Sequence, residues 1–176
     1  MNISNIIQTL LSNFTLTFFV IGLIFSAVAI YKHRTEATKA FIIEVIYKYY
    51  CFWALGVCYT YNGIIHIVFH EMAAGFIGWA DSPFQIELGV ASLGFGIVGL
   101  LSLKNDFGLR LGLVVSTSIF LWGCASGHVY QIITTGNMAA GNAGVMLWTG
   151  LLQPVISLVL LRLSYVTSKT GYKLAA

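Results

Sequence analysis

HIVFHEMAAGFIGWADSPFQIE, residues 66–87, is the stretch around which the chain is organised. It begins with His66 and His70, two histidines four positions apart at the end of a long apolar run. It ends with Glu87, one turn into the next apolar run. A fourth ionisable group, His128, closes another apolar run. Ionisable side chains at membrane depth are energetically expensive and tend to mark function. We therefore expect the rest of the chain to hold these groups at one level of a bilayer.

The composition is that of an integral membrane protein. Of the 176 residues, 58% are hydrophobic and only 9% are charged, and the mean hydropathy is +0.86. Soluble domains carry roughly a quarter charged residues. At about 20 residues per span, the length favours a single all-α transmembrane domain over residues 1–176, with the lipid bilayer as its partner. The net charge of +3 does not indicate a nucleic-acid partner, because the basic residues form a topology signal.

Five apolar runs predict five transmembrane helices, over residues 10–31, 51–70, 84–103, 111–133 and 145–165. Residues 35–50 mix charged and apolar side chains, with Glu44 and Lys48 one helical turn apart. This segment is expected to form either an interfacial helix or an inward extension of the second span. Asp81 or Ser82 is the predicted cap of the third span, because Pro83 suits the first turn of a helix.

The basic residues predict the orientation. Placing the N-terminus outside puts all nine Lys and Arg residues on the inner side and none in the outer segments. These residues are Lys32, Arg34, Lys39, Lys48, Lys104, Arg110, Arg162, Lys169 and Lys173. Cytoplasmic segments of membrane proteins carry an excess of Lys and Arg. The chain is therefore expected to have its N-terminus outside and its C-terminus in the cytoplasm.

This topology brings four potential metal ligands to one depth. His66 and His70 lie at the outer end of the second span, Glu87 at the outer start of the third and His128 near the outer end of the fourth. At 1.5 Å per residue, each lies within about two turns of the outer boundary. Three imidazoles and a carboxylate suit Zn, Fe, Cu or Mn. The sequence therefore predicts a metal site formed by these four residues near the outer face.

Further polar residues on the same faces are expected to support the ligands or to contact a substrate. Metal-bound histidines usually donate their second ring nitrogen to a neighbouring polar group. Positions three and four apart share a helix face, and others lie at the mouth of the site. The candidates are Tyr59, Asn62, Glu71, Gln85, Gln131 and Gln153.

Several alternatives stay open at this stage. Haem b needs one axial histidine from each of two helices, for instance His66 or His70 with His128, and this arrangement leaves Glu87 and the other histidine without a clear task. The polar residues also suit a structural hydrogen-bonded network in a subunit of a larger membrane complex, or a proton or ion path through Glu87 and the histidines in a transporter. If a metal is bound, its role is redox or hydrolytic chemistry on a lipid or quinone-like molecule, or metal handling.

Glycines and cysteines are interpreted as packing residues. The segment GFGIVG, residues 94–99, matches a dinucleotide-binding pattern but lies within an apolar helix, so close helix packing explains it better. The pairs Gly108/Gly112 and Gly123/Gly127 predict contacts with a second copy or with other membrane subunits. Three cysteines lie within apolar runs, and their odd number argues against a disulfide framework: Cys51, Cys58 and Cys124.

A family resemblance rests on the segment Gly78-Trp-Ala-Asp-Ser-Pro-Phe-Gln-Ile-Glu-Leu-Gly89, which is followed by a glycine-rich span. Over residues 78–100 the chain resembles an uncharacterised family of small polytopic bacterial membrane proteins. The resemblance implies a location in the bacterial inner membrane, with a Ser-Pro-Phe-Gln-x-Glu turn as the family's marker. It implies no activity.

Overall fold

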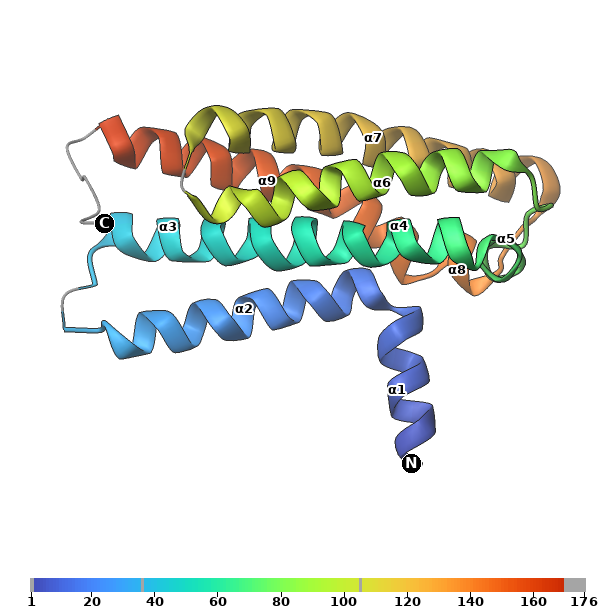
Figure 1. The fold of residues 1–176 in the computed structure, drawn as a ribbon, viewed down its shortest axis with the longest axis horizontal. Helices are drawn as coiled ribbons and strands as arrows, with labels where there is room; N and C mark the ends of the chain where they lie inside the picture. The colour runs from blue at the N-terminus through green and yellow to red at the C-terminus, as the bar shows by residue number, and fades with distance from the viewer. Residues whose placement is uncertain (1, 36, 105, 170–176) are drawn as a thin grey trace.

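The computed structural model describes residues 2–35, 37–104 and 106–169, and their regular structure is entirely helical (Figure 1). Five helices are long and apolar enough to cross a membrane: Phe14–Lys32, Lys39–Val68, Pro83–Lys104, Phe107–Thr135 and Ala140–Ser168. The predicted helical fold, with five helices long and apolar enough to span a membrane, is confirmed. The second span begins at Lys39 rather than at residue 51, so residues 39–50 form an extension of this span and not a separate interfacial helix.

The spans are assembled from shorter elements. In chain order these are α1 (Ile3–Ser12), α2 (Phe14–Lys32), α3 (Lys39–Tyr49), η1 (Tyr50–Val57), α4 (Cys58–Val68), α5 (His70–Ile77), α6 (Pro83–Leu101), η2 (Ser102–Lys104), α7 (Phe107–Thr135), α8 (Ala140–Ala143) and α9 (Val145–Lys169). The segments α3, η1 and α4 run on as one rod, in which η1 is a π-helix (Figure 1). Tyr47, Cys51, Leu55 and Tyr59 of this rod are buried, so it forms the centre of the bundle.

Small residues bring α6 against this central rod. A Cβ atom at Gly99 would lie 2.5 Å from the Cα atom of Gly56, and one at Gly96 would lie 2.5 Å from the backbone nitrogen of Thr60. Both distances are too short for a side chain, so the two backbones touch at these positions. The packing interpretation of the GFGIVG segment is therefore confirmed at Gly96 and Gly99, whereas Gly94 faces open space.

The connection between α5 and α6 turns the chain back on itself. Gly78 ends α5 in the left-handed conformation with φ of 76°, which glycine adopts without steric strain. Pro83 occupies the first turn of α6, as predicted. Ser82 takes the N-cap position but makes no capping hydrogen bond through its side chain, and Asp81 binds His70 instead. The predicted side-chain cap is therefore not formed.

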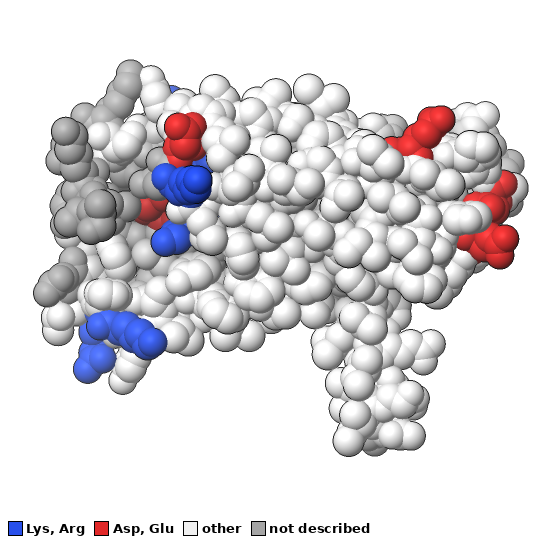
Figure 2. Space-filling model, viewed as in Figure 1, with Lys and Arg blue, Asp and Glu red and all other residues white. Residues whose placement is uncertain are grey.

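The two ends of the bundle differ in charge (Figure 2). The Lys and Arg side chains visible in this view gather at one end, where α2 ends at Lys32 and α3 begins at Lys39, whereas acidic side chains occur at both ends. We call this the basic end, and the opposite end, which contains His70 and Asp81, the histidine end. Among the predicted basic residues, Lys173 and the side chain of Lys169 lie outside the described part of the chain.

Candidate functional site

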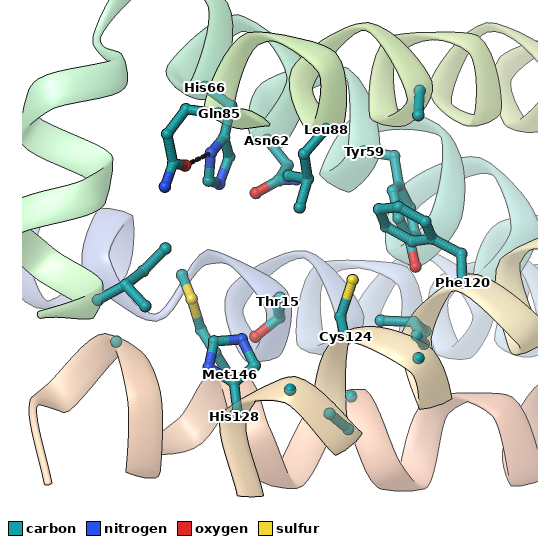
Figure 3. Close-up of a pocket in the computed structure, with 18 of the residues that line it drawn as sticks. Thr15, Tyr59, Asn62, His66, Gln85, Leu88, Phe120, Cys124, His128 and Met146 are labelled. Carbon is teal, nitrogen blue, oxygen red and sulfur yellow. Dashed lines mark hydrogen bonds between the residues drawn. The ribbon is translucent and has the colours of Figure 1, made fainter. Parts of the chain in front are cut away.

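A cavity of about 550 Å³ lies inside the bundle toward the histidine end (Figure 3). Side chains from α2, α4, α6, α7 and α9 line it, and most of the lining is apolar. Pockets that bind small molecules typically enclose about 300–1,000 Å³ and combine apolar walls with a few convergent polar groups. By size and lining, this cavity falls within the range typical of pockets that bind small molecules.

The cavity gathers most of the predicted polar residues. Three of the four predicted ligands line it: His66, Glu87 and His128. Four of the six predicted supporting residues line it as well: Tyr59, Asn62, Gln85 and Gln153. Polar side chains from α4, α6, α7 and α9 therefore line one cavity.

His66 is held in one orientation by α6. It is 7% exposed, and its Nδ1 atom lies 2.8 Å from Oε1 of Gln85, which is 2% exposed. An amide oxygen only accepts hydrogen bonds, so the ring donates through Nδ1. In the neutral ring Nε2 then carries a lone pair and no hydrogen. His66 therefore offers the cavity a hydrogen-bond acceptor or a metal ligand.

His128 reaches the same cavity from α7 and is oriented in the same way. Its Nδ1 atom lies 2.8 Å from Oδ1 of Asn142, a fully buried residue of the short helix α8. Oδ1 also accepts from the indole of Trp79 at 3.2 Å, and the amide nitrogen of Asn142 donates to the His128 carbonyl at 3.3 Å. Figure 3 shows His66 and His128 projecting into the pocket from opposite sides. Both rings thus donate a hydrogen bond to the protein through Nδ1, and their Nε2 atoms stay available to a molecule in the cavity.

His70 does not share the face of His66, which corrects the prediction. The helix breaks at Phe69, whose φ and ψ of −121° and 41° are not helical, and α5 starts in a new direction. The Nδ1 atom of His70 instead lies 2.9 Å from the carboxylate of Asp81. Spacing of four positions predicts a shared face only within an unbroken helix, and here the helix is interrupted between the two histidines.

Two further predicted residues lie away from the cavity lining. Glu71 is exposed on α5, and the side-chain oxygen of Gln131 accepts from the hydroxyl of Thr135 at 3.2 Å. Glu87 lines the cavity but is exposed on α6. Within the three described ranges, no group of three His, Cys, Asp or Glu side chains could hold a metal ion. The predicted four-ligand arrangement is therefore not assembled, and metal binding stays a prediction.

Sequence reasoning missed several residues of the site. Asn142 lies in a connection of small residues that carries no periodic signal, although it fixes His128. Trp79, in the connection before α6, also lines the cavity, with its ring centroid 5.3 Å from that of His128. Cys124, interpreted as packing, also lines the cavity. It is a free cysteine, as are Cys51 and Cys58, which are buried.

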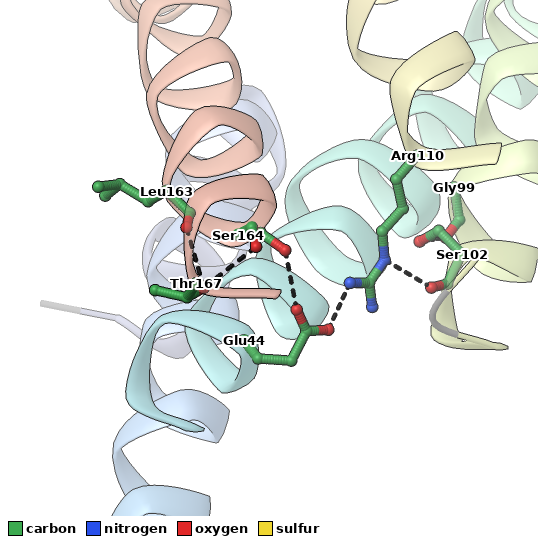
Figure 4. Close-up of polar contacts among 7 residues, drawn as sticks. All are labelled: Glu44, Gly99, Ser102, Arg110, Leu163, Ser164 and Thr167. Atoms are coloured by element: carbon green, nitrogen blue, oxygen red, sulfur yellow. Dashed lines mark hydrogen bonds and ion pairs between the residues drawn. The ribbon is translucent and has the colours of Figure 1, made fainter. Parts of the chain in front are cut away.

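A second buried polar cluster lies at the basic end (Figure 4). Arg110 is 1% exposed, forms an ion pair with Glu44 and donates through Nε to the carbonyl of Ser102 at 3.1 Å. The other carboxylate oxygen of Glu44 accepts from Ser164 at 3.1 Å. These bonds join α3, η2, α7 and α9. Glu44, one helical turn from Lys48, is therefore paired with Arg110 of α7.

Comparison with known proteins identifies the family to which the chain belongs. Residues 12–170 match a family described as "Family of unknown function (DUF6790)". The chain belongs to this family. The match confirms the resemblance to an uncharacterised family and extends it from residues 78–100 to most of the chain. Every lining residue of the cavity lies within the DUF6790 match, whereas α1 precedes it except for Ser12. No match was found among curated proteins or among solved structures.

Proposed function

We propose that this DUF6790 protein binds, within the membrane, a lipid-soluble molecule whose head group carries hydroxyl groups, such as a quinol. The proposal rests on one observation. His66 and His128 reach one mostly apolar cavity from two helices, and each uses Nδ1 for an amide oxygen and leaves Nε2 to the cavity.

The tautomer of the two rings favours this ligand class. A neutral imidazole that donates through Nδ1 can only accept through Nε2, so the matching ligand atom is a hydroxyl donor. The apolar walls suit an aromatic ring. A hydrogen bond is stronger at low local dielectric than in water. A quinol carries two hydroxyls on one apolar ring, one for each histidine.

The expected location is the bacterial inner membrane, with the histidine end outside. The gathering of Lys and Arg at the opposite end supports this orientation, because cytoplasmic segments carry the excess of basic residues. The ligand would then reach the cavity at the depth of the outer leaflet.

Haem b is a second candidate, favoured by the same pair of histidines. Axial histidines bind iron through one ring nitrogen, and metal-bound histidines usually donate the other to a neighbouring oxygen. His70 is occupied by Asp81, so the earlier objection that haem leaves a spare histidine no longer applies. A metal ion bound by some of the predicted ligands is distinguished by the same experiment.

The deciding experiment is purification without chelators and without a metal-affinity tag. It is followed by an optical spectrum, elemental analysis, and mass spectrometry of extracted organic molecules. We expect no Soret band, no stoichiometric metal, and binding of a short-chain quinol analogue. His66→Leu and His128→Leu should each lower the affinity for this analogue at least tenfold, and His70→Leu should leave it unchanged.

Three other results overturn the quinol proposal. A Soret band that disappears in His66→Leu and His128→Leu assigns haem to the cavity. Stoichiometric metal that is lost in either variant assigns a metal ion. Folded protein that binds the analogue equally with and without the two histidines shows that they do not form the site.

A further inference from the structure

A second hollow lies directly beside the cavity, between α1 and the α4–α5 segment. It encloses about 1060 Å³ and is lined mostly by apolar side chains. Ile7 and Leu11 contribute from α1, and Ile65, Phe69 and Met72 from the opposite wall. Among the residues that the structure describes, no Asp, Glu, Lys or Arg lines it. We call this hollow the α1 groove.

The helix α1 leaves the bundle sideways near the histidine end (Figure 1). Apolar residues recur along it at the spacing of one helix face: Ile3, Ile6, Ile7, Leu10 and Leu11. All five are exposed, and the helix carries no charged residue. A helix with one apolar face, set across the spans, lies in the membrane interface with that face toward the acyl chains. The α1 groove is therefore at a depth where hydrocarbon chains are present.

The α1 groove and the cavity lie side by side and meet at His66. Five residues line both spaces: Phe14, Asn62, His66, Ile77 and Met146. The imidazole that anchors the proposed head group is therefore also part of the groove wall. A molecule whose head is bonded to His66 has the groove as an apolar path for whatever extends from that head.

We infer that the molecule in the cavity carries a long hydrocarbon chain, and that this chain lies in the α1 groove beneath α1. This inference rests on the proposed function, because it takes the head group in the cavity as given. The helix α1 has ten residues, so at 1.5 Å per residue it is about 15 Å long and covers that length of the hydrocarbon chain. The substrate class is thus a lipid with a hydroxylated head and an extended tail, and not a small polar solute.

The test uses full-length protein in lipid nanodiscs and a quinol analogue whose alkyl chain ends in a photoreactive diazirine. Cross-linked peptides are mapped by mass spectrometry. We expect cross-links on α1 or on residues 65–73. Ile7→Trp fills the groove and should lower the cross-linking yield at least fivefold. Leu10→Trp is the matched control, because Leu10 is exposed on the same helix but does not line the groove.

Binding of a chainless analogue is measured in parallel and separates the two proposals. Ile7→Trp and Leu10→Trp should both bind it as the unmodified protein does, because neither residue lines the cavity. Cross-links confined to other helices, or an equal yield in Ile7→Trp and Leu10→Trp, overturn the groove assignment while head-group binding stands. Failure of the unmodified protein to bind the chainless analogue overturns both.

Discussion

At the scale of single residues, the orientation of the two histidines depends on two buried amides. Gln85 and Asn142 are each almost fully buried and accept from Nδ1 of His66 and His128, respectively. Without these acceptors either ring is free to rotate or to change tautomer, and Nε2 is no longer directed into the cavity. The amides are therefore positioning residues for the proposed ligand.

Replacing Gln85 tests this positioning role. Gln85→Leu should lower the affinity for the quinol analogue about tenfold, since loss of one such hydrogen bond corresponds to roughly 1.4 kcal/mol. Gln85→Glu should retain more binding than Gln85→Leu, because a carboxylate oxygen still accepts from Nδ1. Titration of the three purified proteins measures this. Equal affinity in Gln85→Leu and unmodified protein contradicts the role.

Asn142 should also contribute to stability. It accepts from His128 and Trp79 and donates to the carbonyls of His128 and Asn137. Asn142→Leu leaves several of these groups buried without a partner, at about 1–3 kcal/mol each. We expect a clearly lower midpoint of thermal unfolding in detergent. The control is Gln131→Leu, outside the cavity, with a change within about 0.5 kcal/mol. Similar midpoints for both variants exclude a special role for Asn142.

At the scale of the elements, backbone contact between α6 and the central rod sets the walls of the site. Gly56 and Gly99 meet at a distance that excludes a side chain, and this close approach fixes where α6 presents Gln85 to His66. In membranes, close packing of small residues substitutes for the hydrophobic driving force between helices.

Adding a methyl group at this contact should separate the helices. Gly99→Ala should be strongly destabilising, because the new Cβ would lie 2.5 Å from backbone atoms of Gly56. Overpacking typically costs about 1–3 kcal/mol. Gly112→Ala is the control, because nothing lies within 4 Å of its added Cβ. Unfolding in mixed detergent micelles measures both. Equal stability of the two variants would mean that the contact does not hold α6.

The Arg110–Glu44 ion pair joins the elements at the basic end. Removing one partner of a buried pair typically costs about 3–5 kcal/mol, since the remaining charge loses its compensation. Arg110→Met and Glu44→Leu should each be strongly destabilising, and the double variant should be less destabilised than the sum of the two. Arg162→Met, at an exposed site, is the control. Strict additivity in this double-mutant cycle shows that the pair makes no coupled contribution.

At the scale of the whole molecule, separation of charge between the ends predicts the orientation. Two single-cysteine variants can report on which side of the membrane each end lies. Thr134 is exposed near the histidine end, and Ser168 is exposed on the last turn of α9. A membrane-impermeant maleimide should label Thr134→Cys in intact cells, and Ser168→Cys only after permeabilisation. The native cysteines are buried or partly buried, and the unmodified protein serves as the control. The reverse labelling pattern overturns the orientation.

Contacts with other subunits stay a prediction at this scale. Added Cβ atoms at Gly112 and Gly123 meet open space, so packing within this chain does not use these positions. Gly123 and Gly127 line the cavity, where the absence of side chains leaves room for a ligand. The pair Gly108/Gly112 is exposed and is the remaining candidate surface for a partner.

Hydropathy and charge alone predicted the helical class and the five long apolar helices. These properties follow from the order of residues along one chain. Which groups meet depended on tertiary packing. The break at Phe69 removes His70 from the face of His66, and the fold of residues 136–144 brings Asn142 to His128. Helical periodicity holds only within an unbroken helix, so it carries no information about breaks, loops or the rotation of one helix against another.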